Sequence, residues 1–137
     1  MVGVILISHG TLAESFLQAA LEILGEPEGV ESICLPKLLD EREILDAVQR
    51  ARRSTDKGDG VLILTDMFGG TPCNLCFSLL EEKQVEVLTG MNLPMVLKIL
   101  SSRHDSSLPE LARIGRDCGR ENIYLARELL EKRTRND

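Results

Sequence analysis

One of the two histidines in this chain stands where it could do chemistry. The apolar stretch Val2 to Ser8 predicts a buried strand, and His9 follows it directly. Asp66 likewise follows a second apolar stretch, at 61–65. A carboxylate beside an imidazole can hold the proton of one ring nitrogen and leave the lone pair of the other exposed, which makes the imidazole a nucleophile. The same two side chains could also form a purely structural hydrogen bond.

The pattern of apolar residues along the chain predicts an α/β fold in which these two side chains meet. Strands are expected at 2–8, 30–35, 61–65 and 85–89, and helices at 11–24, 40–58, 71–82, 95–102 and from 107 onward. The apolar stripe of the first helix begins at Leu12. Such alternation predicts a doubly wound, mainly parallel sheet with helices on both faces. In the common strand order 2-1-3-4, His9 and Asp66 would meet at the switch point where such sheets bind ligands.

Helix starts beside both residues add groups that attract anions. Thr11 with Glu14 predicts a capping box at the start of the helix after His9, and Thr71 with Pro72 predicts another helix start. The N–H groups and the dipole at a helix N-terminus favour a phosphate, and glycines let the backbone approach it closely. The candidate phosphate-binding residues are Gly10, Thr11, Gly69, Gly70 and Thr71. The alternative is that the glycine pair merely forms a tight turn.

A phosphoryl group bound here would have to arrive on a donor other than a nucleotide. The chain has no GxxxxGK[ST] loop, and its nearest match to a dinucleotide glycine pattern has Ile63 in place of the third glycine. A histidine, a carboxylate and backbone amides can supply the alignment and charge stabilisation that phosphoryl transfer needs. Apolar residues on the same loops could dock a partner protein or pack on the core: Met67, Phe68, Met91, Leu93 and Pro94.

Composition and charge narrow the possible functions. The 137 residues suit a single domain, 1–137, that needs no cofactor or metal to fold. The net charge of -6 argues against nucleic acid as a partner. No apolar stretch approaches the ~20 residues needed to span a bilayer and the start lacks a basic signal segment, so we expect a cytoplasmic protein. Residues 120–137 are ambiguous between a helix and an antiparallel edge strand.

The spacing of the cysteines raises the possibility of a redox site. Cys73 and Cys76 form a CxxC pattern at a predicted helix start, where the pKa of a thiol falls and redox chemistry becomes possible. Cys76 also continues the apolar stripe of that helix, which favours simple packing. Cys34 and Cys118 are remote in sequence, so a zinc site built from all four cysteines is not indicated.

Three stretches of the sequence carry a resemblance to a known family. ISHGTLAE, LTDMFGGTPCN and LTGMNLPMVLKIL together resemble the enzyme IIA domain of the mannose-type bacterial sugar phosphotransferase system, over residues 1 to about 102. The resemblance implies a cytoplasmic phosphotransferase that works through a phosphohistidine. It implies that His9 takes a phosphoryl group from phospho-HPr and passes it to a IIB subunit. Asp66 would orient His9, and the turn from Gly69 to Thr71 would cradle the phosphate.

The same resemblance implies how the chain assembles. Family members usually form homodimers with a final antiparallel strand at the sheet edge, sometimes exchanged between subunits. They associate with the membrane subunits IIC and IID without entering the membrane themselves. Two features of this chain depart from the pattern: Ser15 replaces a common glycine, and the tail from Gly119 onward matches weakly.

Three alternatives to a sugar phosphocarrier stay open at this point. The first is a regulatory IIA protein that is phosphorylated as a signal without sugar transport. The second is the phosphotransferase subunit of dihydroxyacetone kinase, although its second motif lacks FGGTPCN. The third is a small tetrapyrrole chelatase, in which His9 and His104 would present a metal; His104, however, lies in the polar stretch SSRHDSS.

Overall fold

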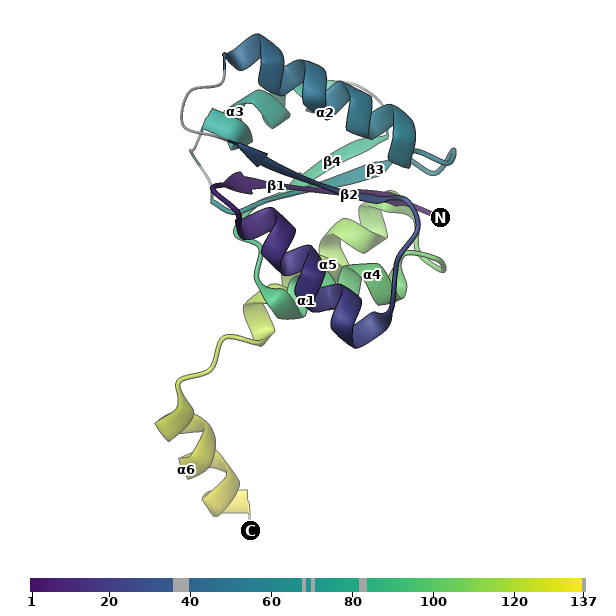
Figure 1. The fold of residues 1–137 in the computed structure, drawn as a ribbon. Coiled ribbons are helices and arrows are strands. Elements are labelled where there is room, and N and C mark those ends of the chain that lie inside the picture. Colours follow the sequence, from purple (N-terminus) through teal and green to yellow (C-terminus); the bar gives the residue numbers. More distant parts are fainter. Residues whose placement is uncertain (36–39, 68, 70, 82–83, 137) are drawn as a thin grey trace.

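A four-stranded parallel sheet forms the centre of the molecule. The computed structural model describes residues 1–35, 40–67, 69, 71–81 and 84–136. The strands are β1 (Gly3–His9), β2 (Val30–Leu35), β3 (Val61–Thr65) and β4 (Val85–Leu88). Their order is β2-β1-β3-β4 and each neighbouring pair is parallel, which confirms the predicted doubly wound sheet (Figure 1).

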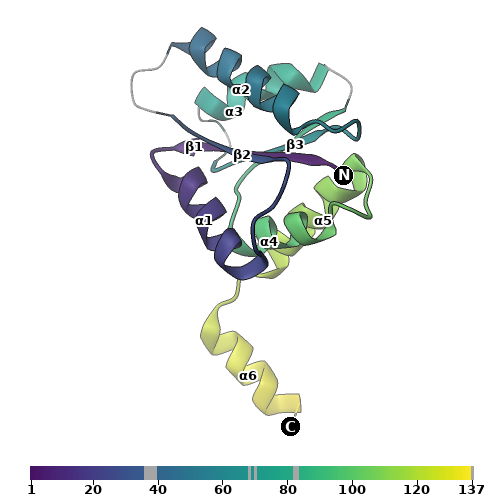
Figure 2. The ribbon, with the colours of Figure 1, turned by 45° about the vertical axis from the view of Figure 1, so that its right-hand side comes forward.

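Helices cover both faces of this sheet. They are α1 (Leu12–Leu24), α2 (Glu41–Thr55), α3 (Thr71–Phe77), a 3-10 turn (Ser78–Glu81), α4 (Leu93–Ser102) and α5 (Leu108–Glu121). Helices α1, α4 and α5 lie on one face, and α2 and α3 lie on the other (Figures 1 and 2). None of the helices in the described part of the chain combines the length and the apolar character that a membrane crossing requires.

Side chains that alternate along β1 divide the core into two clusters. Val4 and Leu6 pack with the apolar residues of α1, α4 and α5, whereas Ile5 and Ile7 pack with those of α2 and α3. All four are fully buried, as a central strand of a covered parallel sheet requires. Burial of each such side chain contributes about 1.5–3 kcal/mol, so the strand that ends at His9 is firmly anchored.

The turn from β1 into α1 is held by a side chain that the sequence pattern did not indicate. Thr11 is the N-cap residue of α1, but its side chain makes no capping hydrogen bond. The Oγ of Ser8 instead accepts a hydrogen bond from the backbone N–H of Ala13, at 2.7 Å. The predicted capping box of Thr11 with Glu14 is therefore wrong. The backbone of Thr11, at φ -102° and ψ 10°, lies outside the extended conformation that a capping side chain needs.

The C-terminal segment forms a helix where an edge strand was a possibility. Ala126–Asn136 form α6, which projects away from the sheet and its covering helices (Figures 1 and 2). The sheet has no fifth strand within the described residues, so the antiparallel edge strand is not formed. Leu, Ala, Arg, Glu and Lys dominate this segment and all favour helix. Large apolar side chains on and before α6 are exposed: Ile123, Tyr124, Leu125, Leu129 and Leu130.

Candidate active site

The pairing of β1 with β3 brings His9 and Asp66 together, as predicted. Ile7 pairs with Thr65, so the two residues leave neighbouring strands at the same edge of the sheet. Nδ1 of His9 lies 2.8 Å from Oδ2 of Asp66, and the backbone N–H of His9 donates to the same oxygen at 3.0 Å. The His9 side chain is 50% exposed and the Asp66 side chain only 10%. A carboxylate anchored in the protein thus holds a ring that is open to solvent.

This contact determines which nitrogen of His9 carries the hydrogen. Burial acts to raise the pKa of Asp66, but the hydrogen bonds from the backbone and the ring of His9 outweigh burial and lower that pKa below its ordinary value. Asp66 is therefore an ionised carboxylate at neutral pH, which only accepts hydrogen bonds. Nδ1 of the neutral ring must then be the donor, and Nε2 keeps its lone pair.

The described residues among those predicted to bind phosphate follow β1 and β3 in the chain, directly after His9 or soon after Asp66. Gly10 has φ +54° and Gly69 has φ +86°, in the left-handed region that favours glycine. Thr11 is exposed at the start of α1, and α3 begins at Thr71. Gly70 lies outside the described residues. The fold therefore supplies two loops at the predicted edge, and their contacts with a phosphate stay a prediction.

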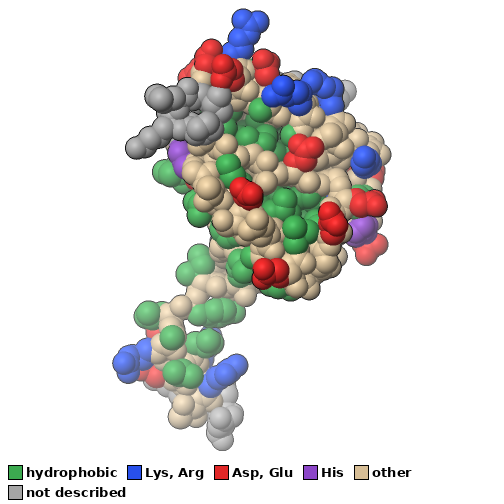
Figure 3. Space-filling view, viewed as in Figure 1, with side chains coloured by type: hydrophobic (Ala, Val, Ile, Leu, Met, Phe, Trp, Pro, Cys, Tyr) green, Lys and Arg blue, Asp and Glu red, His purple; other side chains and the backbone are tan. Residues whose placement is uncertain are grey.

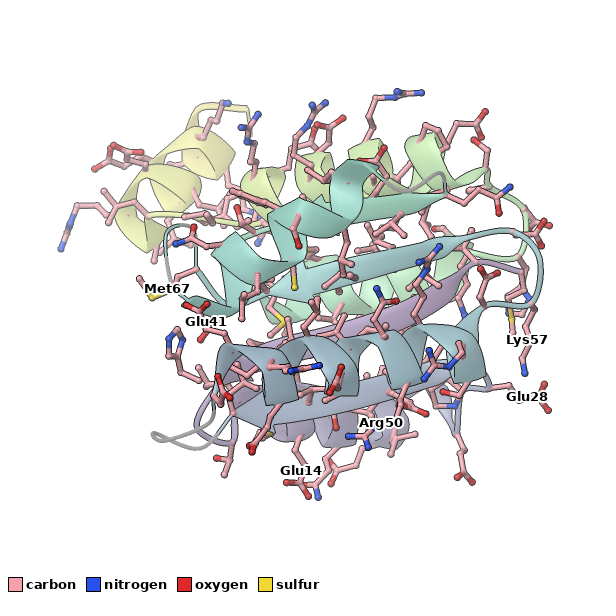
Figure 4. All side chains as sticks on the ribbon, turned by 90° about the horizontal axis from the view of Figure 1, so that it is seen from above. Glu14, Glu28, Glu41, Arg50, Lys57 and Met67 are labelled. Carbon is pink, nitrogen blue, oxygen red and sulfur yellow. The ribbon has the colours of Figure 1, made fainter. Side chains whose placement is uncertain are left out.

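The predicted docking residues differ in how exposed they are to a partner. Met67 is 53% exposed. Figure 4 shows it at the same end of the molecule as Glu41, where α2 begins and the strands terminate. Leu93 and Pro94 are half-buried at the start of α4. Phe68 lies outside the described residues. Met67 is therefore the most accessible of the predicted docking residues that the structure describes.

Met91 is buried, whereas Leu12 is exposed although the apolar stripe of its helix was expected to begin there. Met91 is only 6% exposed, so of the two alternatives left open by the sequence it packs on the core. Its backbone N–H donates to the carbonyl oxygen of Thr65, which draws this loop onto the end of β3 and places the side chain in the core. Leu12, by contrast, is 49% exposed just after the turn that follows His9. It is the first residue of α1, and the buried face of that helix begins at Ala13.

Other candidate ligands lie away from His9. His104 lines a cavity together with Met1, at the end of the sheet where β1 begins. The two histidines accordingly form separate purple patches on opposite sides of the molecule (Figure 3), so they do not form one metal site. Among the described residues, no group of three His, Cys, Asp or Glu side chains could hold a metal ion. Cys76 is fully buried in the core, as the packing interpretation predicts.

These features define a class of protein: a doubly wound α/β domain that presents an imidazole, held by a carboxylate, at the carboxyl edge of its sheet. The family described as EIIA-man, PTS system fructose IIA component, matches residues 3–114. The chain belongs to this family, which confirms the resemblance carried by its three sequence motifs.

Similar proteins come from several bacteria. The chain is 31% identical over 124 residues to the PTS system mannose-specific EIIAB component of Escherichia coli (strain K12), a match that covers 89% of this chain and 38% of that protein. It is 27% identical over 133 residues to the PTS system fructose-specific EIIA component of Bacillus subtilis (strain 168), covering 96% and 91%. The crystal structure of phosphotransferase system component EIIA from Streptococcus agalactiae superposes with a TM-score of 0.85 at 26% identity, covering 93% and 99%.

Asp66→Asn tests the ionised state of the carboxylate. Because the pKa of Asp66 is lower in the folded protein than in the unfolded chain, the ionised group stabilises the fold above its ordinary pKa of 3.8. This contribution is lost as the pH falls through the lowered pKa. We therefore expect the wild-type protein to be more stable than Asp66→Asn at pH 7 and this difference to shrink below pH 3.8.

Urea unfolding of both proteins at pH 7 and at strongly acidic pH measures this difference. Asp46→Asn on the exposed face of α2 is the control for the change in net charge. A stability difference between the wild-type protein and Asp66→Asn that is equal at both pH values would contradict the assignment.

Proposed function

We propose that this chain is a phosphocarrier in sugar uptake: His9 accepts a phosphoryl group from phospho-HPr and passes it to a IIB subunit. The observation that carries the proposal is the hydrogen bond between Nδ1 of His9 and Oδ2 of Asp66, which leaves Nε2 of a half-exposed ring as the nucleophile. Membership of the EIIA-man family supports the same chemistry. The chain spans only 38% of its mannose-specific relative, so the sugar is not assigned.

The proposed transfer exchanges one phosphorus–nitrogen bond for another. The lone pair of Nε2 attacks the phosphorus of the donor's phosphohistidine, and the donor nitrogen keeps the electron pair of the bond that breaks. Nδ1 retains its hydrogen throughout. The His9 ring becomes positively charged as Nε2 is phosphorylated, and the Asp66 carboxylate, 2.8 Å from Nδ1, stabilises this charge. Delivery to IIB is the same step with His9 as the donor.

Backbone amides on both loops are proposed to receive the phosphoryl oxygens. The N-terminus of α1, a helix of 13 residues, carries partial positive charge that favours an anion beside His9. The N–H of Ala13 already donates to Ser8, so we assign this role to the amides at 10–12. The loop at 69–71 would complete the cradle on the other side. Such donors stabilise the charge on the transferred group without covalent chemistry of their own.

Exposed apolar side chains beside His9 fit a protein as donor and acceptor. Leu12 and Met67 are about half exposed, and each follows one of the two residues of the pair in the chain. Leu93 and Pro94, which are half-buried at the start of α4, are proposed to add to the same surface. Since the phosphoryl group must enter and leave through Nε2, HPr and IIB would use this face in turn. The proposed exchange takes place in the cytoplasm, with IIC and IID subunits handling the sugar at the membrane.

We also propose that the chain forms a homodimer through its C-terminal segment. The apolar side chains at 123–125 are 61–75% exposed, and those of Leu129 and Leu130 are 36% and 61% exposed. Green side chains are visible along α6 and the stretch before it in Figure 3, away from the main body. A contiguous exposed apolar surface of this kind marks an interaction site. A second copy of the chain would cover it.

Replacement of His9 tests the phosphocarrier. We expect incubation with labelled phosphoenolpyruvate, enzyme I and HPr to place one acid-labile label on the wild-type protein and none on His9→Ala. His104→Ala is the matched control, because it removes the other histidine of the chain at the far end of the sheet and should keep full labelling. Label on His9→Ala, or loss of label from His104→Ala, would contradict the assignment.

Substitutions in the C-terminal segment test the dimer. We expect sedimentation equilibrium to give a dimer for the wild-type chain and a monomer for a triple variant with serine at residues 123, 124 and 125. A variant with serine at Ile23 and Leu24, which are 59% and 46% exposed on α1, should remain dimeric and controls for the general loss of apolar surface. A monomeric wild-type chain, or a dimeric triple variant, would rule out this interface.

A further inference from the structure

Ser8 is a polar residue in a position that otherwise takes apolar side chains. It directly precedes His9 on β1, and its side chain is fully buried. It lies on the face of the strand that carries Val4 and Leu6, which pack under α1, α4 and α5. Its Oγ accepts a hydrogen bond of 2.7 Å from the backbone N–H of Ala13 in the first turn of α1. This bond therefore spans the whole turn that contains His9.

On the side of α1, a backbone hydrogen bond from the N–H of Ser15 to the carbonyl oxygen of Thr11 also reaches this turn. Gly10 adopts φ +54°, a conformation that glycine enters and leaves easily. Thr11 makes no side-chain capping bond. On the side of the sheet, His9 is in register with Leu35 of β2, and its backbone N–H donates to Oδ2 of Asp66. The bond from Ser8 and the bond to Asp66 thus hold the turn from two sides.

We infer that Ser8 is a positioning residue for the phosphoryl transfer proposed above: its bond to Ala13 orients the peptide between Ser8 and His9 and so keeps the imidazole against Asp66. The N–H that reaches Asp66 belongs to this peptide, which is a rigid plane. Rotation of the plane would turn the N–H away from Oδ2 of Asp66 and shift the Cα from which the ring reaches the same oxygen. Ser8 acts only through His9, and it does not contact the phosphoryl group.

Loss of the Ser8 hydroxyl has two consequences that can be separated. The buried N–H of Ala13 loses its acceptor, so the protein is destabilised, as at any helix start that loses its cap. In addition, the contact between Nδ1 and Asp66 loosens, so a larger fraction of the neutral ring carries its hydrogen on Nε2. That tautomer has no lone pair on Nε2 and cannot accept the phosphoryl group. A merely structural serine would show only the first consequence.

The experiment compares Ser8→Ala with Ser107→Ala. Ser107 is the N-cap residue of α5, where its Oγ accepts from the backbone N–H of Glu110, and it lies away from His9. Both variants lose a serine Oγ that accepts a hydrogen bond at a helix start, but only Ser8→Ala should lower the rate of transfer from phospho-HPr to the folded protein, by about tenfold or more. Ser8→Cys, which keeps the size of the side chain and offers a weaker acceptor, should fold and give an intermediate rate.

The second readout is the ¹⁵N NMR spectrum of the unphosphorylated His9 ring. The fraction of the tautomer with hydrogen on Nδ1 should fall in Ser8→Ala and Ser8→Cys and stay at the wild-type value in Ser107→Ala. Wild-type rates and tautomer fractions in the folded Ser8 variants would overturn the inference, even if their stability drops. A wild-type protein that accepts no phosphoryl group would instead overturn the proposed function, while the tautomer measurement would still test Ser8.

Discussion

A single oxygen, Oδ2 of Asp66, accepts hydrogen bonds from both the ring and the backbone N–H of His9. Because both bonds end on one atom, the orientation of the imidazole and the conformation of the backbone beneath it are coupled. This coupling requires β1 and β3 to be adjacent and parallel, with their ends at the same edge. The sheet order β2-β1-β3-β4 meets that requirement, so the two central strands of the fold determine the position of the His9 ring. Rigid support of this kind is what productive alignment with a partner needs.

The negative charge of Asp66 determines what chemistry the pair can do. The two hydrogen bonds keep Asp66 ionised despite its burial, so it can accept from Nδ1 but has no proton to give. In the proposed transfer, the same carboxylate that selects the tautomer beforehand would stabilise the positive ring afterwards. Gly10 and Gly69 beside the pair both adopt the left-handed conformation that favours glycine. Exposure of half the His9 side chain agrees with the proposed use of this site by two partner proteins in turn.

Much of this arrangement could be predicted from the sequence, because whole strands of apolar residues show which parts of the chain are buried at the centre of the sheet. β1 and β3 are apolar on both faces, which identifies them as central strands. Once they are neighbours, the meeting of His9 with Asp66 follows from topology alone. The role of Ser8 could not be predicted in this way, since the choice between Ser8 and Thr11 as the cap depends on the dihedral angles of the turn. A serine in an otherwise apolar strand, one residue before the histidine, was the available signal.

The conformations of the loops and of the C-terminal segment could be predicted less well from the sequence. Met91 and Leu12 are both apolar residues close to the predicted site. The exposure of Leu12 depends on where α1 begins, and the burial of Met91 depends on the hydrogen bond from its backbone N–H to Thr65. Sequence periodicity does not resolve such one-residue differences. The segment after Glu121 combines helix-favouring residues with exposed apolar side chains, so its conformation depends on what it packs against as well as on its own propensities.

The nitrogen of His9 that carries the phosphoryl group is the most direct test of the proposed role of Asp66. Long-range ¹H–¹⁵N NMR of the phosphorylated protein distinguishes the two ring nitrogens. If Asp66 holds Nδ1 as the structure has it, the phosphorus should be bonded to Nε2, and Nδ1 should retain its hydrogen. A phosphoryl group on Nδ1 would require the contact with Asp66 to break and would contradict the account.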